Sequence, residues 1–275
     1  IARYPALTFS SGPTNSLRGA AVLTGISDAI VVDIGGTTAD VGVLANGFPR
    51  ESNSYIDVGG VRTNFRMPDI LSIGLGGGSL VHDDGGRLGP QSVGHRLVSA
   101  GLAFGGATLT ATDIAVANGS TAVGDMTGVA HLDAGLVERA TLTMHAMIDE
   151  AVDKMRPSEQ PVPVILVGGG SILISRHLQT ASTVIRPEHA GVANAIGAAI
   201  AQVGGEVEHI VSYSRESREK AMTYATTQAR SKAIAAGADP DTLRVLDIEE
   251  TTMSYMDDDA AKIRIKVVGN LRQFL

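Results

Sequence analysis

The sequence of 275 residues has no cysteine and carries fewer basic than acidic residues. Without cysteine, the chain can form no disulfide, no thiolate nucleophile and no cysteine-ligated zinc or iron–sulfur site. This absence fits a reducing compartment, and we expect a cytoplasmic location. The 22 Lys and Arg residues against 29 Asp and Glu residues give a net charge of −7. Because the basic residues also form no cluster, we expect no nucleic-acid-binding surface.

Long hydrophobic runs are also absent. No segment approaches the ~18 uninterrupted apolar residues that a membrane span requires, so no membrane segment is predicted. The composition, with 44% hydrophobic and 19% charged residues, is that of a folded globular protein. A chain of this length buries roughly three-quarters of its surface on folding, so a sizeable core is expected, in one large domain or two smaller ones.

Glycine, in contrast, is abundant, with 33 residues, and many of them are bunched. Doublets or triplets occur at 35–36, 59–60, 76–78, 85–86, 105–106, 168–170 and 204–205. Such groups suit turns with positive φ and positions where a ligand approaches the backbone closely.

The apolar pattern predicts alternating strands and helices over the first two hundred residues. Strands are predicted at 29–34, 39–44, 163–167 and 183–185, and helices at 11–23, 136–155, 172–179 and 192–203. Residues 59–127 are rich in glycine and lack helical periodicity, which predicts loops, short strands and an insertion. Beyond 205, a helix at 214–236 with Ser214 as its N-cap and strands at 243–248 and 262–268 predict a small α+β unit.

The segment from Asp33 to Asp40 is the first candidate site. Two glycines and two threonines, Gly35, Gly36, Thr37 and Thr38, form a tight turn between two strands, with a carboxylate on either side. Backbone N–H groups at such a turn can hold anionic oxygens, and a strand-terminal Asp beside them suits a hydrated Mg²⁺. The alternative is a hairpin with a glycine turn and a capping Asp.

A second glycine segment, Gly168, Gly169, Gly170 and Ser171, follows a buried strand. The order of hairpin, strand, glycine segment and the small-residue helix near 194–200 resembles the second domain of actin-like, sugar-kinase-like and heat-shock-chaperone ATPases. In that fold the hairpin holds the β- and γ-phosphates, and the later glycine segment lies against the adenosine. A packing role for a glycine-rich helix start is the alternative.

Polar residues in the glycine-rich region form a further cluster. His82, Asp83, Asp84 and His95 can bind a divalent metal, act as acid and base on a ring carbonyl, or be solvated loop residues. Arg62 and Arg66 near Asp69 suit a substrate carboxylate or a loop salt bridge. His145 on the 136–155 helix is interpreted as a structural histidine, and Asp257–Asp259 as a charged turn or a weak Ca²⁺ site.

Several segments together resemble the hydantoinase/oxoprolinase family, and specifically its hydantoinase A domain. The matching segments are 11–20, 33–41, 68–70, 73–79, 88–92 and 110–113, in the family's order. The resemblance implies ATP-dependent ring opening of a cyclic amide such as a hydantoin, 5-oxoproline or a lactam, or an ATP-dependent carboxylation. Members of the family usually have a Pro-, Gly- and Cys-rich stretch at the place of residues 93–100, and this sequence departs from it. The family's typical substrate pocket is therefore not carried over to this chain.

The resemblance also implies partners. Members carry an earlier Asp-x-Gly-Gly-Thr segment in a preceding domain, and no second copy occurs before Ser11. We therefore expect a missing N-terminal domain that forms the other wall of the ATP site, together with a second subunit and an oligomeric assembly. A nucleotide-driven, reactivase-like module that acts on a partner protein, and a purely structural assembly surface, are the alternative functions.

These inferences define the predicted organisation. The fold is an α/β, ribonuclease H-like (actin-like ATPase) second domain with a glycine-rich insertion and a small C-terminal α+β unit. We expect a linking helix at 1–27, the ATPase domain at 28–206 with the insertion at about 58–130, and the helix–hairpin unit at 207–275. The expected catalytic residues are Asp33, Asp40, His82 and Asp83; the expected ligands of ATP are Gly35, Gly36, Thr37, Thr38, Gly168, Gly169, Gly170 and Ser171, with Asp33 on Mg²⁺.

Overall fold

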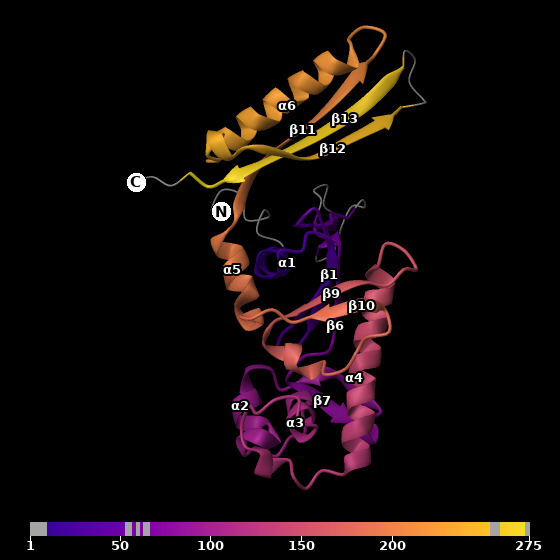
Figure 1. Cartoon of the computed structure of the whole chain (residues 1–275), viewed down its shortest axis with the longest axis vertical. Coiled ribbons are helices and arrows are strands. Elements are labelled where there is room, and N and C mark those ends of the chain that lie inside the picture. Colours follow the sequence, from indigo (N-terminus) through magenta and orange to yellow (C-terminus); the bar gives the residue numbers. More distant parts are fainter. Residues whose placement is uncertain (1–9, 53–56, 59–60, 63–66, 254–258, 273–275) are drawn as a thin grey trace. The chain divides into compact units, whose positions relative to one another are not determined.

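The computed structural model describes residues 10–52, 57–58, 61–62, 67–253 and 259–272 (Figure 1). The chain divides into two compact units, Ile1–Ala199 and Ile200–Leu275.

A six-stranded mixed sheet forms the centre of the first unit, in the order β10-β9-β1-β2-β3, with β6 also paired to β2. Its strands are β1 (Ala29–Ile34), β2 (Ala39–Ala45), β3 (Phe48–Pro49), β6 (Ile70–Ile73), β9 (Val162–Val167) and β10 (Ala181–Ile185). β10, β9 and β1 run parallel, whereas β2 is antiparallel to β1. The strands predicted within the first two hundred residues are therefore confirmed, with small differences at their ends.

Helices cover both faces of this sheet. On one face lies α4 (Ala134–Met155), which is the helix predicted from 136 to 155, and on the other lie α1 (Ser11–Thr24) and α5 (Ala193–Ala199). Because side chains alternate along a strand, Val32 of β1 packs in the cluster with α4, whereas Val31 packs with α1. Asp33, two positions after Val31, therefore lies on the α1 side.

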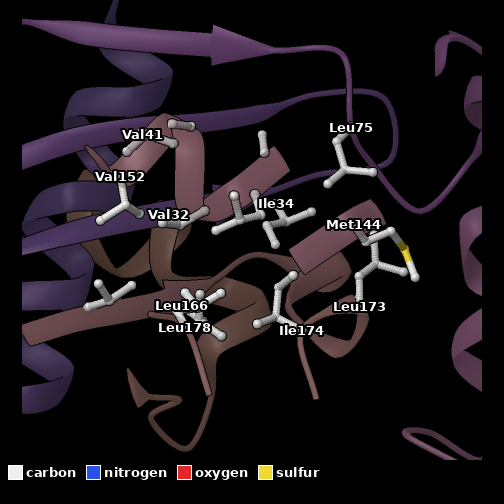
Figure 2. Packing of buried hydrophobic residues seen from close by; sticks show 14 of the residues in the cluster. Val32, Ile34, Val41, Leu75, Met144, Val152, Leu166, Leu173, Ile174 and Leu178 are labelled. Carbon is white, nitrogen blue, oxygen red and sulfur yellow. The ribbon is translucent and has the colours of Figure 1, made fainter. Parts of the chain in front are cut away.

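The core on the α4 side is built from fully buried aliphatic residues (Figure 2). Val32, Val41 and Leu166 come from three neighbouring strands, and Met144 and Val152 come from α4. Burial of a side chain of this size stabilises the fold by about 1.5–3 kcal/mol. The packing fixes the ends of β1, β2 and β9, where the candidate site begins.

Smaller elements complete the first unit. They are β4 (Asp57–Val58), β5 (Val61–Arg62), β7 (Ser79–His82), β8 (Arg87–Ser92), α2 (Leu97–Ala100) and α3 (Ala111–Ala117). Asp113 is fully buried and accepts hydrogen bonds from Ala103 N (2.7 Å) and Thr110 N (2.8 Å). Thr110 and Asp113 form a capping box, which defines where α3 begins.

The helix predicted at 172–179 is wrong. The chain instead makes a short 3₁₀ turn at Gly169–Leu173 and then continues without regular structure to β10. Two side chains of α4 replace the helical hydrogen bonds: His145 Nε2 accepts from the amides of Ser175 and Arg176, and Asp149 accepts from the amides of the residues at 179 and 180. Tertiary contacts thus override local propensity.

His145 has the structural role predicted for it. The side chain is buried, and both ring nitrogens have partners. Because Nε2 accepts from two backbone amides, the ring proton lies on Nδ1, which donates to Thr141 O at 2.7 Å. The residue therefore anchors the segment that follows the second glycine segment.

The second unit is a three-stranded antiparallel sheet with one helix. Its elements are β11 (Gln202–Ser212), α6 (Arg218–Ala235), β12 (Arg244–Thr252) and β13 (Ala260–Asn270), in the sheet order β11-β13-β12. The predicted helix and both predicted strands are present, but β11 was not predicted. The N-cap of α6 is Ser217 rather than Ser214. Asp257 and Asp258 lie outside the described residues.

None of the helices in the described part of the chain combines the length and apolar character that a bilayer span requires.

Candidate functional site

The turn between β1 and β2 is open to solvent. Gly36, Thr37 and Thr38 are exposed, and the turn is closed by a hydrogen bond from Gly35 N to Thr38 O at 2.9 Å. A Cβ built at Gly36 would contact nothing within 4 Å. The turn is therefore not covered by packed side chains.

The backbone of this turn is oriented by the glycine segment at 76–78, which lies behind it. Gly77 N donates to Gly35 O at 3.0 Å, and Gly78 N donates to Gly36 O at 2.7 Å. In a planar trans peptide the C=O and the following N–H point in opposite directions. The amides of Gly36 and Thr37 therefore point away from the 76–78 segment, and within the described part of the chain they make no hydrogen bond.

Two carboxylates flank the turn. Asp33 and Asp40 face each other across the β1–β2 pair. Burial raises the pKa of the Asp33 carboxyl above its ordinary value, a hydrogen bond from Ser16 lowers it in part, and the negative charge of Asp40 raises it further. Ser72 donates a hydrogen bond to Asp40. Among the described residues, no basic side chain forms an ion pair with either carboxylate.

The second glycine segment lies directly beside Asp33. β9 is the parallel neighbour of β1, with Val167 opposite Asp33, so Gly168 follows at the same edge of the sheet. A Cβ at Gly168 would lie 2.3 Å from Asp33 Oδ1, and one at Gly170 would lie 2.7 Å from Gly35 O. Gly169 is exposed, with no atom within 4 Å of its added Cβ. The two predicted glycine segments thus form one continuous rim.

The donor set at this rim fits a hydrated magnesium ion better than a fully protein-ligated metal. Across the described ranges, no group of three or more His, Asp or Glu side chains is placed to hold a metal ion. Asp33 and Asp40 nevertheless supply two carboxylates whose mutual repulsion a cation would relieve. Mg²⁺ commonly takes only one or two carboxylates and completes its shell with water and phosphate oxygens.

The cluster predicted around His82 does not assemble into a three-ligand site. Asp83 pairs with Arg87 (2.9 Å), and Asp84 pairs with Arg139. The Nε2 atom of His82 is buried and has no hydrogen-bond partner among the described residues. Catalytic roles for His82 and Asp83 stay predictions.

Asp69 forms a salt bridge, but with a different arginine from the two that the sequence suggested. Asp69 pairs with Arg50 at 2.7 Å. The side chains of Arg62 and Arg66 lie outside the described residues.

Several residues at the site were not assigned a role from the sequence. Ser16 of α1, fully buried, donates to Asp33, and Asn194 of α5 donates in turn to Ser16 Oγ at 3.1 Å. Ser92 and Thr112 support the glycine segments from behind. The signal for Ser16, Ser92 and Thr112 was the set of family-like segments, since 11–20, 88–92 and 110–113 all converge on the turn. Asn194 lies outside these segments, in the small-residue helix near 194–200.

Part of the chain is similar in sequence to known proteins. Residues 1–128 match the model of the family described as Hydantoinase/oxoprolinase. The chain is 32% identical over 119 residues to the acetophenone carboxylase gamma subunit of Aromatoleum aromaticum, covering 41% of this chain and 16% of that protein. It is 33% identical over 125 residues to caprolactamase subunit alpha of Pseudomonas jessenii, covering 43% of this chain and 18% of that protein.

Solved structures extend the likeness over nearly the whole chain. An ATP-dependent caprolactamase from Pseudomonas jessenii aligns with a TM-score of 0.59 and 17% identity, covering 94% of this chain and 49% of that one. A nucleotide-free acetone carboxylase aligns with a TM-score of 0.56 and 16% identity, covering 96% and 49%. The chain therefore spans about half of each solved chain, and the predicted α/β actin-like ATPase fold is confirmed.

Proposed function

We propose, from the match of residues 1–128 to the hydantoinase/oxoprolinase family, that this chain carries one wall of the ATP site of an enzyme subunit. The observation that carries this proposal is the turn at 35–38, where residues 36–38 are exposed and the amides of Gly36 and Thr37 make no hydrogen bond within the described part of the chain, between Asp33 and the glycine segment at 168–171. A preceding domain would supply the other wall. The curated relatives are named as subunits, which supports a companion subunit here as well.

The turn would hold the terminal phosphates of ATP. The amides of Gly36 and Thr37 supply donors without bulky side chains in front of them, and the hydroxyls of Thr37 and Thr38 add further donors. The segment Gly168–Ser171 would lie against the adenosine, since its exposed Gly169 leaves the rim open there. Preorganised donors of this kind stabilise the charge of a transferring phosphoryl group.

Asp33 and Asp40 would hold Mg²⁺ through its coordinated waters. A bound Mg²⁺ supplies positive charge that neutralises phosphate oxygens during transfer. Asp33 is placed for this role because β1 ends beside it, Ser16 fixes its carboxylate, and Asp40 faces it from β2. Burial is the main cause of the raised pKa of Asp33, and the cation would offset the smaller contribution that comes from repulsion by Asp40.

The proposed reaction is ATP-dependent ring opening of a cyclic amide. The amide oxygen attacks the γ-phosphorus and ADP leaves, which makes the amide carbon electrophilic. One water adds to that carbon and the ring C–N bond breaks, leaving an acyl phosphate and an amine. A second water releases phosphate, so that the products are ADP, phosphate and an open-chain amino acid. The similarity to the caprolactamase alpha subunit supports this substrate class.

A test substitutes Asp33→Asn in the full-length protein together with its companion subunit. We expect ADP formation stimulated by a cyclic amide to fall by at least about a hundredfold, because the charge that positions Mg²⁺ is lost. The matched control is Asp28→Asn, an exposed carboxylate just before β1 at the opposite end of the strand, which should leave the rate unchanged. Normal ADP formation by Asp33→Asn would refute the role of Asp33.

The similarity to the acetophenone carboxylase gamma subunit favours carboxylation as a second candidate function. The same assay separates the candidates by what stimulates ATP hydrolysis. A cyclic amide should stimulate it under the first proposal, and a ketone with bicarbonate under the second. Stimulation by a partner protein alone would indicate a reactivase-like module instead.

A further inference from the structure

The glycine segment behind the exposed turn is itself held by one threonine. Thr112, at the start of α3, donates to Gly77 O twice, from Oγ1 at 2.9 Å and from its backbone N at 3.0 Å. Its side chain is buried. Of all the described residues, Thr112 is therefore the one that fixes both the position and the direction of the Gly77 carbonyl.

The hydrogen bonds from Thr112 continue through two peptide groups to the open rim. The peptide that carries the Gly77 carbonyl also carries the Gly78 N–H, which donates to Gly36 O at 2.7 Å. The peptide that carries the Gly36 carbonyl also carries the N–H of the exposed Thr37, which points away from the Gly78 amide and has no hydrogen-bond partner within the described ranges. Hydrogen bonds in such a chain polarise one another, so each bond strengthens the donor at the next step.

The two peptide groups between Thr112 and the turn, Gly77–Gly78 and Gly36–Thr37, form a hydrogen-bond relay. Close packing leaves the backbone of this relay little freedom to move. A Cβ at Gly76 would lie 2.4 Å from Thr37 N, one at Gly77 would lie 2.9 Å from Thr112 Oγ1, and one at Gly78 would lie 2.8 Å from Ser92 Oγ. Ser92 Oγ also donates to Gly36 O at 3.3 Å. The 76–78 segment thus transmits the position of Thr112 to the turn without an intervening side chain.

We propose that Thr112 is a positioning residue for nucleotide binding, which acts through the Gly77–Gly78 and Gly36–Thr37 peptides to orient and polarise the Thr37 amide toward a terminal phosphate. This inference rests on the proposed function, because it takes the turn to be the phosphate site. Thr112 does not itself touch the nucleotide. Its hydroxyl matters because it is a second donor to a carbonyl that a backbone amide already holds.

The experiment measures the Kd of ADP and of a non-hydrolysable ATP analogue for the full-length protein and three variants. Thr112→Val removes the hydroxyl and keeps the shape, Thr112→Ser keeps the hydroxyl, and Thr141→Val is the matched control. Thr141 is also fully buried; its Oγ1 donates to Val137 O in its own helix, α4, and accepts from Asn118 Nδ2 at 3.0 Å. Both valine variants lose one buried hydroxyl, and Thr141→Val should lower the melting temperature at least as much as Thr112→Val, because it also leaves Asn118 without this acceptor.

We expect Thr112→Val to weaken both Kd values by about three- to tenfold, the scale of one lost hydrogen bond. Thr112→Ser and Thr141→Val should stay within about twofold of the unsubstituted protein. Unchanged Kd values for Thr112→Val, or an equal loss in Thr141→Val, would overturn the positioning role while leaving the nucleotide site in place. An unsubstituted protein that binds neither nucleotide would instead overturn the proposed function, and this role with it.

Amide hydrogen exchange of the nucleotide-free protein tests the relay by a route that does not need a ligand. In Thr112→Val, exchange at Gly77 and Gly78 should be faster than in the unsubstituted protein, because their bonds to the turn loosen. In Thr141→Val it should be unchanged. Equal exchange rates at Gly77 and Gly78 in all three proteins would show that Thr112 does not hold this segment.

Discussion

At the scale of single residues, Asp33 is a half-buried carboxylate at the candidate site, and its pKa is raised above the ordinary value. Burial is the main cause of its raised pKa, and the facing carboxylate of Asp40 adds to it. Asp28 is exposed and lies just before the first residue of β1. Hydrogen bonds from Ser27 and from Asn46 N lower its pKa, whereas the pKa of Asp33 is raised. The two carboxylates are therefore expected to have opposite effects on stability.

The pH dependence of stability tests this contrast. A carboxyl whose pKa is raised on folding costs stability when it ionises, so the cost is absent below the ordinary carboxyl pKa, grows as the pH rises from that value, and is complete above the raised pKa. Asp33→Asn should therefore be more stable than the unsubstituted protein at neutral pH, and this excess should vanish below the ordinary carboxyl pKa of about 4. Urea unfolding at a series of pH values, without nucleotide or divalent cation, measures the difference in the free energy of unfolding between the two proteins.

Asp28→Asn is the control with the opposite sign. Its lowered pKa contributes stability that is present above the ordinary carboxyl pKa and is lost as the pH falls through the lowered value. The variant should therefore be less stable than the unsubstituted protein at neutral pH, and equal to it in acid. If Asp33→Asn showed this same pattern, the account of Asp33 as an uncompensated, half-buried carboxylate would be wrong.

At the scale of elements, the packing of α1 on α5 positions Ser16 on Asp33. The helices approach so closely that a Cβ at Gly19 would lie 1.9 Å from Ala193 O and one at Gly197 would lie 1.8 Å from Asn15 O. Asn194 Nδ2 donates to Gly12 O at 2.8 Å and to Ser16 Oγ at 3.1 Å. The small-residue helix near the end of the first unit is thus part of the support for the site.

Gly197→Ala should separate these helices. The added methyl group cannot fit against the backbone of Asn15, so we expect a loss of about 1–3 kcal/mol in the free energy of unfolding. Gly191→Ala is the matched control, since its added Cβ would meet nothing within 4 Å and its φ is not positive. Chemical denaturation of both variants gives the comparison. Equal stabilities would show that α1 and α5 do not pack as closely as described.

Elements with a strong local pattern could be predicted from the sequence, and those set by tertiary contacts could not. The β1–β2 hairpin and α4 have continuous apolar runs or clear helical periodicity, and both are present. The absent helix at 172–179 has a suitable composition, but His145 and Asp149 bind its amides from α4. No pattern within that segment reports on those partners.

Strand β11 illustrates a second reason for a missed element. It contains Gly204 and Gly205, and glycine in a strand is unfavourable unless something approaches closely. Here α6 does so, since a Cβ at Gly205 would lie 2.2 Å from Ala229 O. The preceding run of small residues also continues the pattern of α5, which made a longer helix the simpler prediction.

At the scale of the whole molecule, each of the two compact units has a core of its own. The core of the second unit lies between α6 and the sheet, where Ile263 and Ile265 are fully buried. On β13, Arg264 is buried as well and is neutralised by Glu206 at 2.6 Å and Glu249 at 2.8 Å. The candidate site belongs entirely to the first unit, so nucleotide contacts on this chain are expected there alone.

The candidate site could be predicted in part. Its residues at 33–40 and 168–171 follow from glycine patterns at strand ends, and parallel pairing of β1 with β9 brings them together. The support from Ser16, Asn194 and Thr112 could not be derived, because it depends on contacts between segments separated by 17 to 178 residues, such as Ser16 with Asn194. Family-like segments marked Ser16 and Thr112 without giving them roles, and Asn194 lies outside those segments.

The most direct test of the nucleotide site is an amide hydrogen-exchange footprint of the full-length protein with and without a non-hydrolysable ATP analogue and Mg²⁺. We expect the bound analogue to slow amide exchange at 35–38 and at 168–171. We expect no change at the turn around Asn46 and Gly47, at the opposite end of the hairpin, or within 202–270. Protection that leaves 35–38 unchanged, or that appears instead at Asn46 and Gly47, would contradict the assignment of the β1–β2 turn as the phosphate site.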